Sequence, residues 1–354
     1  MSASDDTRFL ALLVHRGHLT REEAEQLFPH LREGHELDVL LEEQLGWAVE
    51  DIARLRRTQA GEIPEIPGYE VLSKLGTGGT SDVFKAREKK TGRLMALKVL
   101  NDASTRNAGT RRDFINEARM LERLGHDGLV KGYGIARSGT TYFSKMEWVD
   151  GSTLLELLDE GQPFDEQAAL RVVLAAAEVL LYLGTQGVVH RDVKPGNVML
   201  SQNGKVKLID LGFAAQGGET TNEEGTAKGT VQYLSPEQAR GGAAADIRSD
   251  IYSLGVTLFH LVVGRLPFEG SNDSEVLRKQ VMESLSSPEL KSRGLSPHLH
   301  YFIEKMMAKD VQVRYQSWDE LIGDIQEQLA GRDSLDYERE ARRGRRSSPS
   351  SRRP

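Results

Sequence analysis

The sequence contains no cysteine among its 354 residues. This absence excludes disulfide bonds, thiolate nucleophiles and cysteine-ligated zinc sites. It is compatible with a reducing compartment, and we expect a cytoplasmic protein.

Long apolar runs are also missing. The N-terminal stretch MSASDDTRFLALLVHRGHL has acidic residues where a secretory signal has basic ones, and His15 and Arg16 interrupt its apolar run. The longest uncharged candidate elsewhere, Val179 to Val189, has 11 residues and includes two glycines, which makes it too short and too polar to span a bilayer. We therefore expect no membrane segment.

Charge is unevenly placed along the chain. The formal net charge is −7, yet residues 338–354 carry seven arginines and only two glutamates. Because apolar residues nearly vanish over 329–354, we expect a disordered Arg/Ser-rich tail. A basic tail can bind nucleic acid, but this one has no interleaved aromatic residues or folded basic face, so we expect no nucleic-acid partner.

The first 61 residues have helical patterning. The segments GHLTREEAEQL at 17–27 and GWAVEDIARL at 46–55 share a glycine, acids in the first turn and apolar residues three or four apart. This weak repeat predicts two helical hairpins, a small all-α module over 1–61. The module either binds a protein partner, docks on the rest of the chain, or is a solubilising extension without a specific partner.

Two prolines and two glycines in GEIPEIPG break the pattern, and we place a linker at 62–68. From 69 onward, YEVLSKLG, TSDVFKARE and RLMALKVL alternate like antiparallel strands. A helical pattern with Phe114, Ala118 and Leu121 on one face follows, and the chain is mainly helical after Gly151. These patterns predict an antiparallel sheet that starts at Tyr69 and a mainly helical region after Gly151.

Glycines lie between the first two predicted strands, at Gly76, Gly78 and Gly79. Glycines let backbone N–H groups approach phosphate oxygens without an intervening Cβ. Alone, the stretch fits a simple hairpin turn equally well. A dinucleotide-binding fold would need a helix directly afterwards, whereas a strand follows, and the lysine of a Walker A loop is absent.

A lysine stands in the apolar strand MALKV. Lys98 there is costly to bury unless it is paired, and Glu117 lies on the helix face that should meet the sheet. A snorkelling Lys98 and a solvated Glu117 explain these two residues equally well.

Two polar loops complete the candidate set, HRDVKPGN at 190–197 and DLG at 210–212. Asp192 could accept a hydroxyl proton, and Lys194 could neutralise a transferring phosphoryl group. Asn197 and Asp210 offer the hard oxygen ligands that Mg²⁺ prefers. Phosphoryl transfer needs this combination of positioning and charge neutralisation.

With these residues in place, the chain resembles the eukaryotic-type (Hanks-type) serine/threonine protein kinase family, in its bacterial-like branch. The family's motifs occur in its order: GTGGTSDV, MALK, Glu117, HRDVKPGN, DLG, SPE at 235–237 and DIYSLG at 250–255. The resemblance covers about 69–328 and implies an α+β, bilobal protein-kinase fold. Its N-lobe is an antiparallel sheet with the C-helix, the helix that carries Glu117, and its C-lobe is mainly helical. It also implies ATP and Mg²⁺ as cofactors and Ser/Thr-containing proteins as substrates.

The resemblance assigns roles to individual residues. Asp192, Lys194, Lys98 and Glu117 are expected to be catalytic, and Asn197 and Asp210 to bind Mg²⁺. The residues expected to bind ATP are Leu75, Gly76, Thr77, Gly78, Gly79, Val83, Ala96, Lys98, Met146, Glu147, Val149 and Met199. Two structural roles follow as well: Asp250 should hold the catalytic loop, and Glu237 should pair with Arg314.

Lys194 and Thr230 match the serine/threonine branch of the family. Arg191 could receive a phosphothreonine of the activation loop, with Thr226 the best-placed acceptor and Thr220 and Thr221 next. The alternative function is a pseudokinase-like scaffold or signalling adaptor that acts through the helical module. The complete catalytic set argues against it, because a scaffold has no physical reason to retain those residues.

Departures from the family pattern carry two further expectations. Gly132 stands where a bulky apolar residue normally stacks with Leu121, His190 and Leu211, so we expect a gap that loosens the C-helix. An alignment shifted by one residue would place Tyr133 there instead. Kinases that prefer an arginine upstream of the acceptor have acids at three places, which Gly196, Thr153 and His260 occupy in this chain. We therefore expect no strong preference for arginine.

Overall fold

The computed structural model describes residues 3–161, 164–212, 214–216, 230–241, 245–285 and 295–331. The chain forms two compact units, one comprising Met1–Arg112 with Ile135–Trp148 and the other Asp113–Gly134 with Val149–Pro354. Thr220, Thr221, Thr226 and nearly all of the predicted tail lie outside the described residues. The boundaries predicted at 62–68 and 328 stay predictions.

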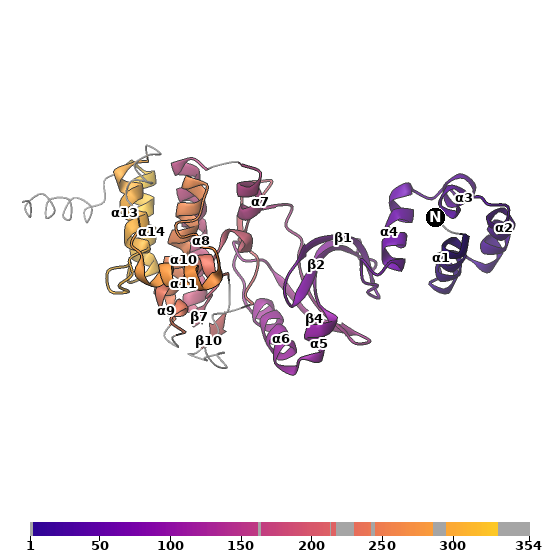
Figure 1. The fold of residues 1–354 in the computed structure, drawn as a ribbon, viewed down its shortest axis with the longest axis horizontal. Coiled ribbons are helices and arrows are strands. Elements are labelled where there is room, and N and C mark those ends of the chain that lie inside the picture. The colour runs from indigo at the N-terminus through magenta and orange to yellow at the C-terminus, as the bar shows by residue number, and fades with distance from the viewer. Residues whose placement is uncertain are drawn as a thin grey trace, which may run out of the picture. The chain divides into compact units, whose positions relative to one another are not determined.

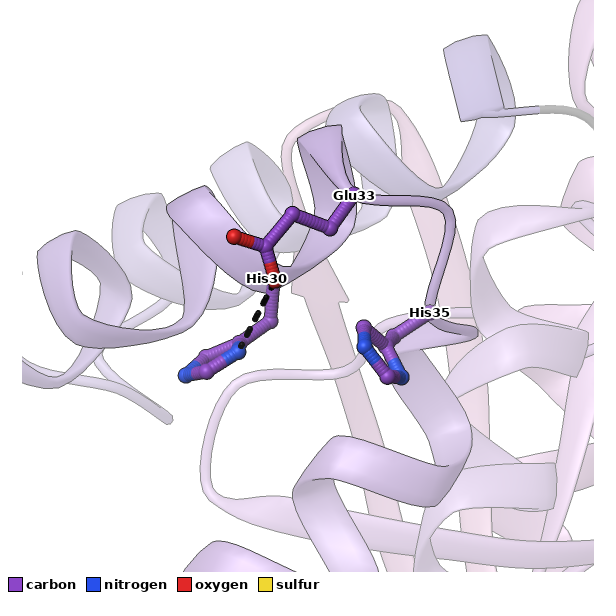
Figure 2. Close-up of side chains that lie close together, drawn as sticks. All are labelled: His30, Glu33 and His35. Carbon is purple, nitrogen blue, oxygen red and sulfur yellow. Dashed lines mark ion pairs between the residues drawn. The ribbon is translucent and has the colours of Figure 1, made fainter.

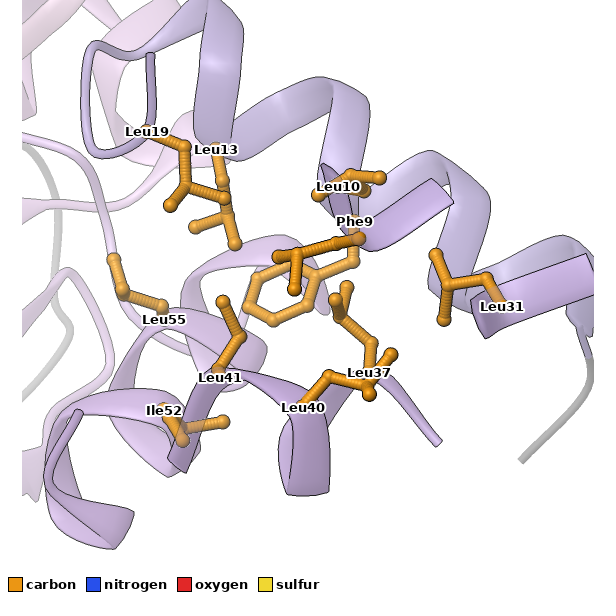
Figure 3. Packing of buried hydrophobic residues seen from close by; sticks show 11 residues of the cluster. Phe9, Leu10, Leu13, Leu19, Leu31, Leu37, Leu40, Leu41, Ile52 and Leu55 are labelled. Carbon is orange, nitrogen blue, oxygen red and sulfur yellow. The ribbon is translucent and has the colours of Figure 1, made fainter. Parts of the chain in front are cut away.

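The N-terminal module is helical, as predicted. Its four helices are α1 (Ala3–His15), α2 (Arg21–Arg32), α3 (Leu37–Leu45) and α4 (Val49–Gln59). Thr20 begins α2 with a capping box to Glu23, and Gly46 ends α3 in the left-handed conformation. Leucines from every helix surround Phe9 in one buried cluster (Figure 3).

A buried ion pair ties three of these helices together. Asp6 of α1 is buried, accepts a hydrogen bond from the Leu37 backbone N–H at 3.2 Å, and pairs with Arg56 of α4. Arg56 also lies 2.6 Å from the Asp38 carboxylate of α3, and its guanidinium stacks 4.0 Å from the Phe9 ring centre. Because a buried carboxylate is costly without a partner, Arg56 should be essential to the module.

The module contacts the sheet that follows it in the same unit. Arg54 lies 2.6 Å from Glu70 of β1 (Tyr69–Thr77), and Arg16 lies 2.9 Å from Glu65. Ile63 and Ile66, from the segment 62–68, belong to the buried cluster of the sheet. This segment therefore packs against the sheet.

The sheet has five antiparallel strands in the order β1-β2-β3-β5-β4. The strands after β1 are β2 (Ser81–Glu88), β3 (Leu94–Leu100), β4 (Gly132–Ser138) and β5 (Thr141–Glu147). Two helices, α5 (Asp102–Arg106) and α6 (Ala108–Arg123), connect β3 to β4. Phe114, Ala118 and Leu121 are the buried face of α6, as their spacing predicted.

The rest of the described chain is mainly helical, which confirms the predicted α+β class. Its helices are α7 (Leu154–Asp159), α8 (Glu166–Thr185), α9 (Pro236–Ala239), α10 (Ile247–Val263), α11 (Asp273–Met282), α13 (Pro297–Met306) and α14 (Trp318–Leu329). Helix α10 is buried over almost its whole length, and α8 and α13 pack against it (Figure 1). Short strands frame the polar loops: β6 (Gly151–Thr153), β8 (Val198–Ser201), β9 (Val206–Leu208), and β7 (Val188–Val189) paired with β10 (Ala215–Gln216).

Helix α8 is long and apolar enough to cross a membrane, judged by length and composition alone. The uncharged stretch from Val179 covers only the end of this helix, because Glu178 and Arg171 lie within it. Leu170, Val173 and Leu180 are among its buried residues, and it packs against α10 and α14. A core position accounts for its hydrophobicity.

Candidate active site

The loop between β7 and the short 3₁₀ turn at Pro195–Asn197 is held by Asp250, in the first turn of α10. Its carboxylate accepts the backbone N–H of His190 at 2.8 Å and that of Arg191 at 2.7 Å. Burial raises the pKa of Asp250, while the two N–H donors and the nearby charges of His190 and Arg191 oppose that rise. The predicted role of Asp250 is confirmed.

The backbone of this loop is strained at Arg191. Its φ is 66°, the only positive φ of a non-glycine residue in the described parts of the chain. A left-handed conformation costs energy for such a residue, so surrounding contacts must hold it. Asp250 holds the Arg191 N–H, and Gln238 donates its side-chain amide to the Arg191 carbonyl at 2.9 Å.

Asp192 is the centre of a polar cluster. Its side chain is only 5% exposed, and its Oδ2 lies 2.7 Å from Nζ of Lys194 and 3.0 Å from Nδ2 of Asn197. The Asn197 amide also donates to the Asp192 carbonyl at 2.8 Å. Asp192 is therefore fixed by two neighbours from its own loop, with its carboxylate beside a cation.

Lys194 connects this loop to a distant segment. Its Nζ donates to the Thr230 hydroxyl at 2.8 Å, just before the 3₁₀ turn Val231–Tyr233. The structure thus brings Thr230 next to Lys194 and Asp192, although Thr230 follows Lys194 by 36 positions.

The segment that carries Asp210 is hydrogen-bonded to the loop at 190–197. The Ile209 backbone N–H donates to the Asn197 carbonyl at 3.0 Å, which ties the end of the β9 segment to the catalytic loop. Asp210 Oδ1 accepts the Gly212 N–H at 3.0 Å, so the DLG turn is closed on its own aspartate. The two residues predicted to bind a metal therefore sit on directly connected segments.

Glu117 of α6 reaches the same turn. A Cβ built on Gly212 would lie 3.3 Å from Asp210 Oδ1 and 3.6 Å from Glu117 Oε2. The Asp210 and Glu117 carboxylates therefore both lie close to Gly212.

The predicted catalytic lysine, Lys98, lies on a strand of the five-stranded sheet. Lys98 lies on β3 opposite Ser144 and Val83, and Ala96 lies opposite Met146, both of them nearly buried. Lys98 and Glu117 fall in different units, and their pairing stays a prediction.

The predicted ATP-binding residues are distributed over both units, with most of them in the first. The β1–β2 turn is closed by the Gly78 N–H, which donates to the Ser81 carbonyl at 2.8 Å. In the second unit, Val149 is buried and Met199 of β8 pairs with Thr153 of β6. The first unit holds the others: Leu75, Gly76, Thr77, Gly79, Val83 and Glu147.

The gap expected at Gly132 is wrong. A Cβ on Gly132 would lie 2.7 Å from the Leu121 carbonyl carbon and 2.8 Å from the Glu122 nitrogen, both in the backbone of α6. The missing side chain therefore lets the backbone of β4 approach α6 directly. A Cβ on Gly134, two residues on, would instead lie 2.9 Å from Oε1 of the Glu122 side chain.

The predicted pair of Glu237 and Arg314 is confirmed. The guanidinium of Arg314 is fully buried and donates to both carboxylate oxygens, at 2.8 and 2.9 Å. Ser249 donates to the same carboxylate at 2.6 Å. Burial would raise the pKa of Glu237, but the hydrogen bonds and charge of Arg314, together with Ser249, hold that pKa at about 2.

Gln238 is the contact that sequence reasoning missed. The pattern Ser235 to Gln238 is a capping box, which signals the start of α9 but not the bond from Gln238 to Arg191. That bond joins two segments 47 residues apart, and it depends on tertiary packing.

Comparison with known proteins agrees with this geometry. The family model described as the protein kinase domain matches residues 69–324. A probable serine/threonine-protein kinase of Streptomyces coelicolor is 37% identical over 273 residues, which cover 74% of this chain and 40% of that protein. Serine/threonine-protein kinase PknB of Mycobacterium leprae is 36% identical over 263 residues, with 73% and 42% covered. The chain thus matches about two fifths of the length of these relatives.

Proposed function

Because the chain belongs to the protein kinase domain family, we propose that it transfers the γ-phosphoryl group of ATP to serine or threonine hydroxyls of protein substrates. The observation that carries this proposal is the polar cluster of the catalytic loop. Asp192 is buried, fixed by Asn197 at 3.0 Å and placed 2.7 Å from the Lys194 ammonium.

Asp192 is suited to receive the proton of an acceptor hydroxyl. A carboxylate held by two partners loses little freedom when a hydroxyl hydrogen-bonds to it, and it orients the hydroxyl oxygen toward the phosphorus. The proton moves to Asp192 as the bond from oxygen to phosphorus forms and the bond from phosphorus to the leaving ADP oxygen breaks. Lys194 lies close enough to offset negative charge on the transferring group.

The side chains at the proposed metal site fit Mg²⁺. Asn197 uses its Nδ2 for both of its bonds to Asp192, which leaves its side-chain oxygen Oδ1 as the ligand atom. Asp210 adds a carboxylate, so the donors are the oxygens that Mg²⁺ prefers. When bound, the ion would neutralise phosphate charge, while the chain's own residues hold the acceptor and the proton.

ATP would be held mainly by the first unit. Lys98 would contact its phosphates, the β1–β2 turn would approach them through backbone N–H groups, and the apolar side chains of Ala96 and Met146 would face the adenine. Ala96 and Met146 are nearly buried, so their positions are fixed by packing before ATP binds.

Two features of the proposal concern substrates and regulation. Thr153 caps α7, His260 hydrogen-bonds Tyr233 at 2.8 Å, and Gly196 faces Leu155, so none of the three positions offers an acid to an upstream arginine.

For regulation, burial lowers the pKa of the Arg191 guanidinium, opposed by the charge of Asp250. A phosphate on Thr226 would offset that cost of burial by pairing with Arg191.

The experiment is phosphorylation of a peptide array with labelled ATP and Mg²⁺, followed by identification of the labelled amino acids. We expect phosphoserine and phosphothreonine, no phosphotyrosine, and no strong selection for arginine two or three residues before the acceptor. Label on tyrosine, or dominant selection for arginine, would contradict the substrate assignment. A Thr226→Ala protein with full activity would remove the proposed regulation. A scaffold without turnover would incorporate no label at all.

A further inference from the structure

Three metal-ligating side chains gather at the end of α2, far in sequence from the catalytic loop. They are His30 in the last turn, Glu33 at the C-cap and His35 two residues later. Their ligand atoms all lie within 4.8 Å of one another, and His30 Nδ1 is 3.8 Å from a Glu33 carboxylate oxygen. Figure 2 shows the two imidazoles and the carboxylate on one side of the turn.

The backbone itself brings the two histidines together. Gly34 has a φ of 94°, its N–H donates to the Leu31 carbonyl at 3.2 Å, and the His35 N–H donates to the His30 carbonyl at 3.1 Å. This pair of bonds is a Schellman motif, in which the residue after the left-handed glycine contacts the residue five positions before it. Those two positions usually carry apolar side chains, whereas here both carry imidazoles, 5.9 Å apart between ring centres and nearly perpendicular.

The turn is anchored on both sides by the core of the module. Leu31 precedes Glu33 and Leu37 follows His35, and both leucines are buried in the cluster around Phe9. His30 is half-buried while Glu33 and His35 are exposed. The ligands are therefore on a fixed backbone and remain open to solvent, so an ion and a water molecule can reach them.

The donor set selects a class of metal. Two imidazole nitrogens and one carboxylate oxygen, with a water as fourth ligand, are a donor set that proteins use for Zn²⁺. Mg²⁺ and Ca²⁺ prefer sites made of oxygen alone. In a tetrahedral zinc site with bonds of about 2.0 to 2.1 Å, ligand atoms lie roughly 3.3 Å apart. The three side chains are exposed or half-buried, so rotation about their side-chain bonds can bring the ligand atoms from their present separations, all within 4.8 Å, to the zinc spacing.

We propose that His30, Glu33 and His35 form a binding site for Zn²⁺ on the N-terminal module. Among the described residues, this is the group of histidine and acidic side chains with the spacing for a metal ion. The bound ion would link the end of α2 to the segment that begins α3, and so stabilise the module. This proposal does not depend on phosphoryl transfer.

The test is zinc binding by the full chain, without a histidine tag and after treatment with a chelator. The titration competes with a chromophoric chelator and contains saturating Mg²⁺, so that the proposed Asn197 and Asp210 site does not take up zinc. We expect one ion per chain. The His30→Ala and His35→Ala variants should each weaken binding by more than about tenfold, whereas His15→Ala, outside the cluster, should leave it unchanged.

Two further readouts separate a metal site from a mere contact between side chains. Co²⁺ in place of Zn²⁺ should give the visible absorption of a tetrahedral ion in the wild type and not in the histidine variants. In the full chain, zinc should raise the midpoint temperature of the N-terminal module's thermal transition in the wild type but not in His35→Ala. The helix content of His35→Ala by circular dichroism should match the wild type. Equal zinc affinity in the wild type and both histidine variants, or binding no tighter than that of Mg²⁺, would overturn the proposal.

Discussion

The buried pair of Glu237 and Arg314 makes a quantitative prediction about stability and pH. Its removal in a Glu237→Gln protein keeps the shape of the side chain but leaves the fully buried Arg314 guanidinium without a charged partner. The segment that carries Glu237 also supplies Gln238, which holds the strained Arg191 backbone. Loss of the pair should therefore weaken both the fold and the catalytic loop.

The magnitude follows from the pKa of Glu237. Its folded-state pKa of about 2 lies below the ordinary 4.5, so the folded state favours the charged form. The stabilisation is present above about pH 4.5 and is lost as the pH falls toward about 2, because the unfolded state then binds the proton more tightly. A difference of about 2.5 pKa units corresponds to about 3 kcal/mol at neutral pH, and it should decline to about 1.4 kcal/mol at about pH 3.

The assay is urea denaturation of the wild type and Glu237→Gln at a series of pH values, compared as the difference in unfolding free energy. Taking the difference cancels the titration of the other carboxylates. We expect a difference of about 3 kcal/mol near pH 5 that shrinks steadily as the pH approaches about 3. A difference that stays constant over this range would refute the assignment of a lowered pKa to Glu237.

Three other substitutions test separate contacts. Asp250→Ala removes the acceptor of one buried and one partly buried backbone N–H group, so it should cost about 2 to 4 kcal/mol in chemical denaturation and reduce phosphoryl transfer; unchanged stability would contradict this. Gly132→Ala places a Cβ 2.7 Å from the α6 backbone and should cost about 1 to 3 kcal/mol in thermal unfolding, whereas Gly125→Ala, with nothing within 4 Å, should be nearly neutral; equal effects would refute the close approach. Arg56→Ala leaves Asp6 buried without its guanidinium, so the module's calorimetric transition should shift to lower temperature by an amount equivalent to about 3 kcal/mol; an unshifted transition would show that the pair is dispensable.

The sequence predicted those contacts that depend on residue types at fixed motif positions. The family resemblance implied that Asp250 holds the loop at 190–197 and that Glu237 pairs with Arg314, because each contact requires only a charged group at one motif position. The buried face of α6 was predictable for a related reason, since Phe114, Ala118 and Leu121 repeat with helical spacing. The antiparallel strands after Tyr69 and the helices after Gly151 followed from alternation and helical periodicity, and the resemblance joined them into an α+β domain.

Contacts that depend on how neighbours relax were not predictable. Gly132 indicated a missing side chain, but only packing shows that the backbones of β4 and α6 close the space. The meeting of Asp6, Asp38 and Arg56 depends on the arrangement of three helices. Helix α2 also continues through Pro29, because Leu31 beyond it is buried in the core, and this tertiary contact outweighs the local cost of proline.

The central claim is that the catalytic loop transfers phosphoryl groups through Asp192. The most direct measurement compares single-turnover phosphorylation by the wild type, Asp192→Asn and the exposed control Asp127→Asn, with ATP binding measured in parallel. Asp192→Asn should bind ATP like the wild type yet transfer the phosphoryl group at least about 100-fold more slowly, and Asp127→Asn should match the wild type. Transfer by Asp192→Asn at the wild-type rate would contradict the claim.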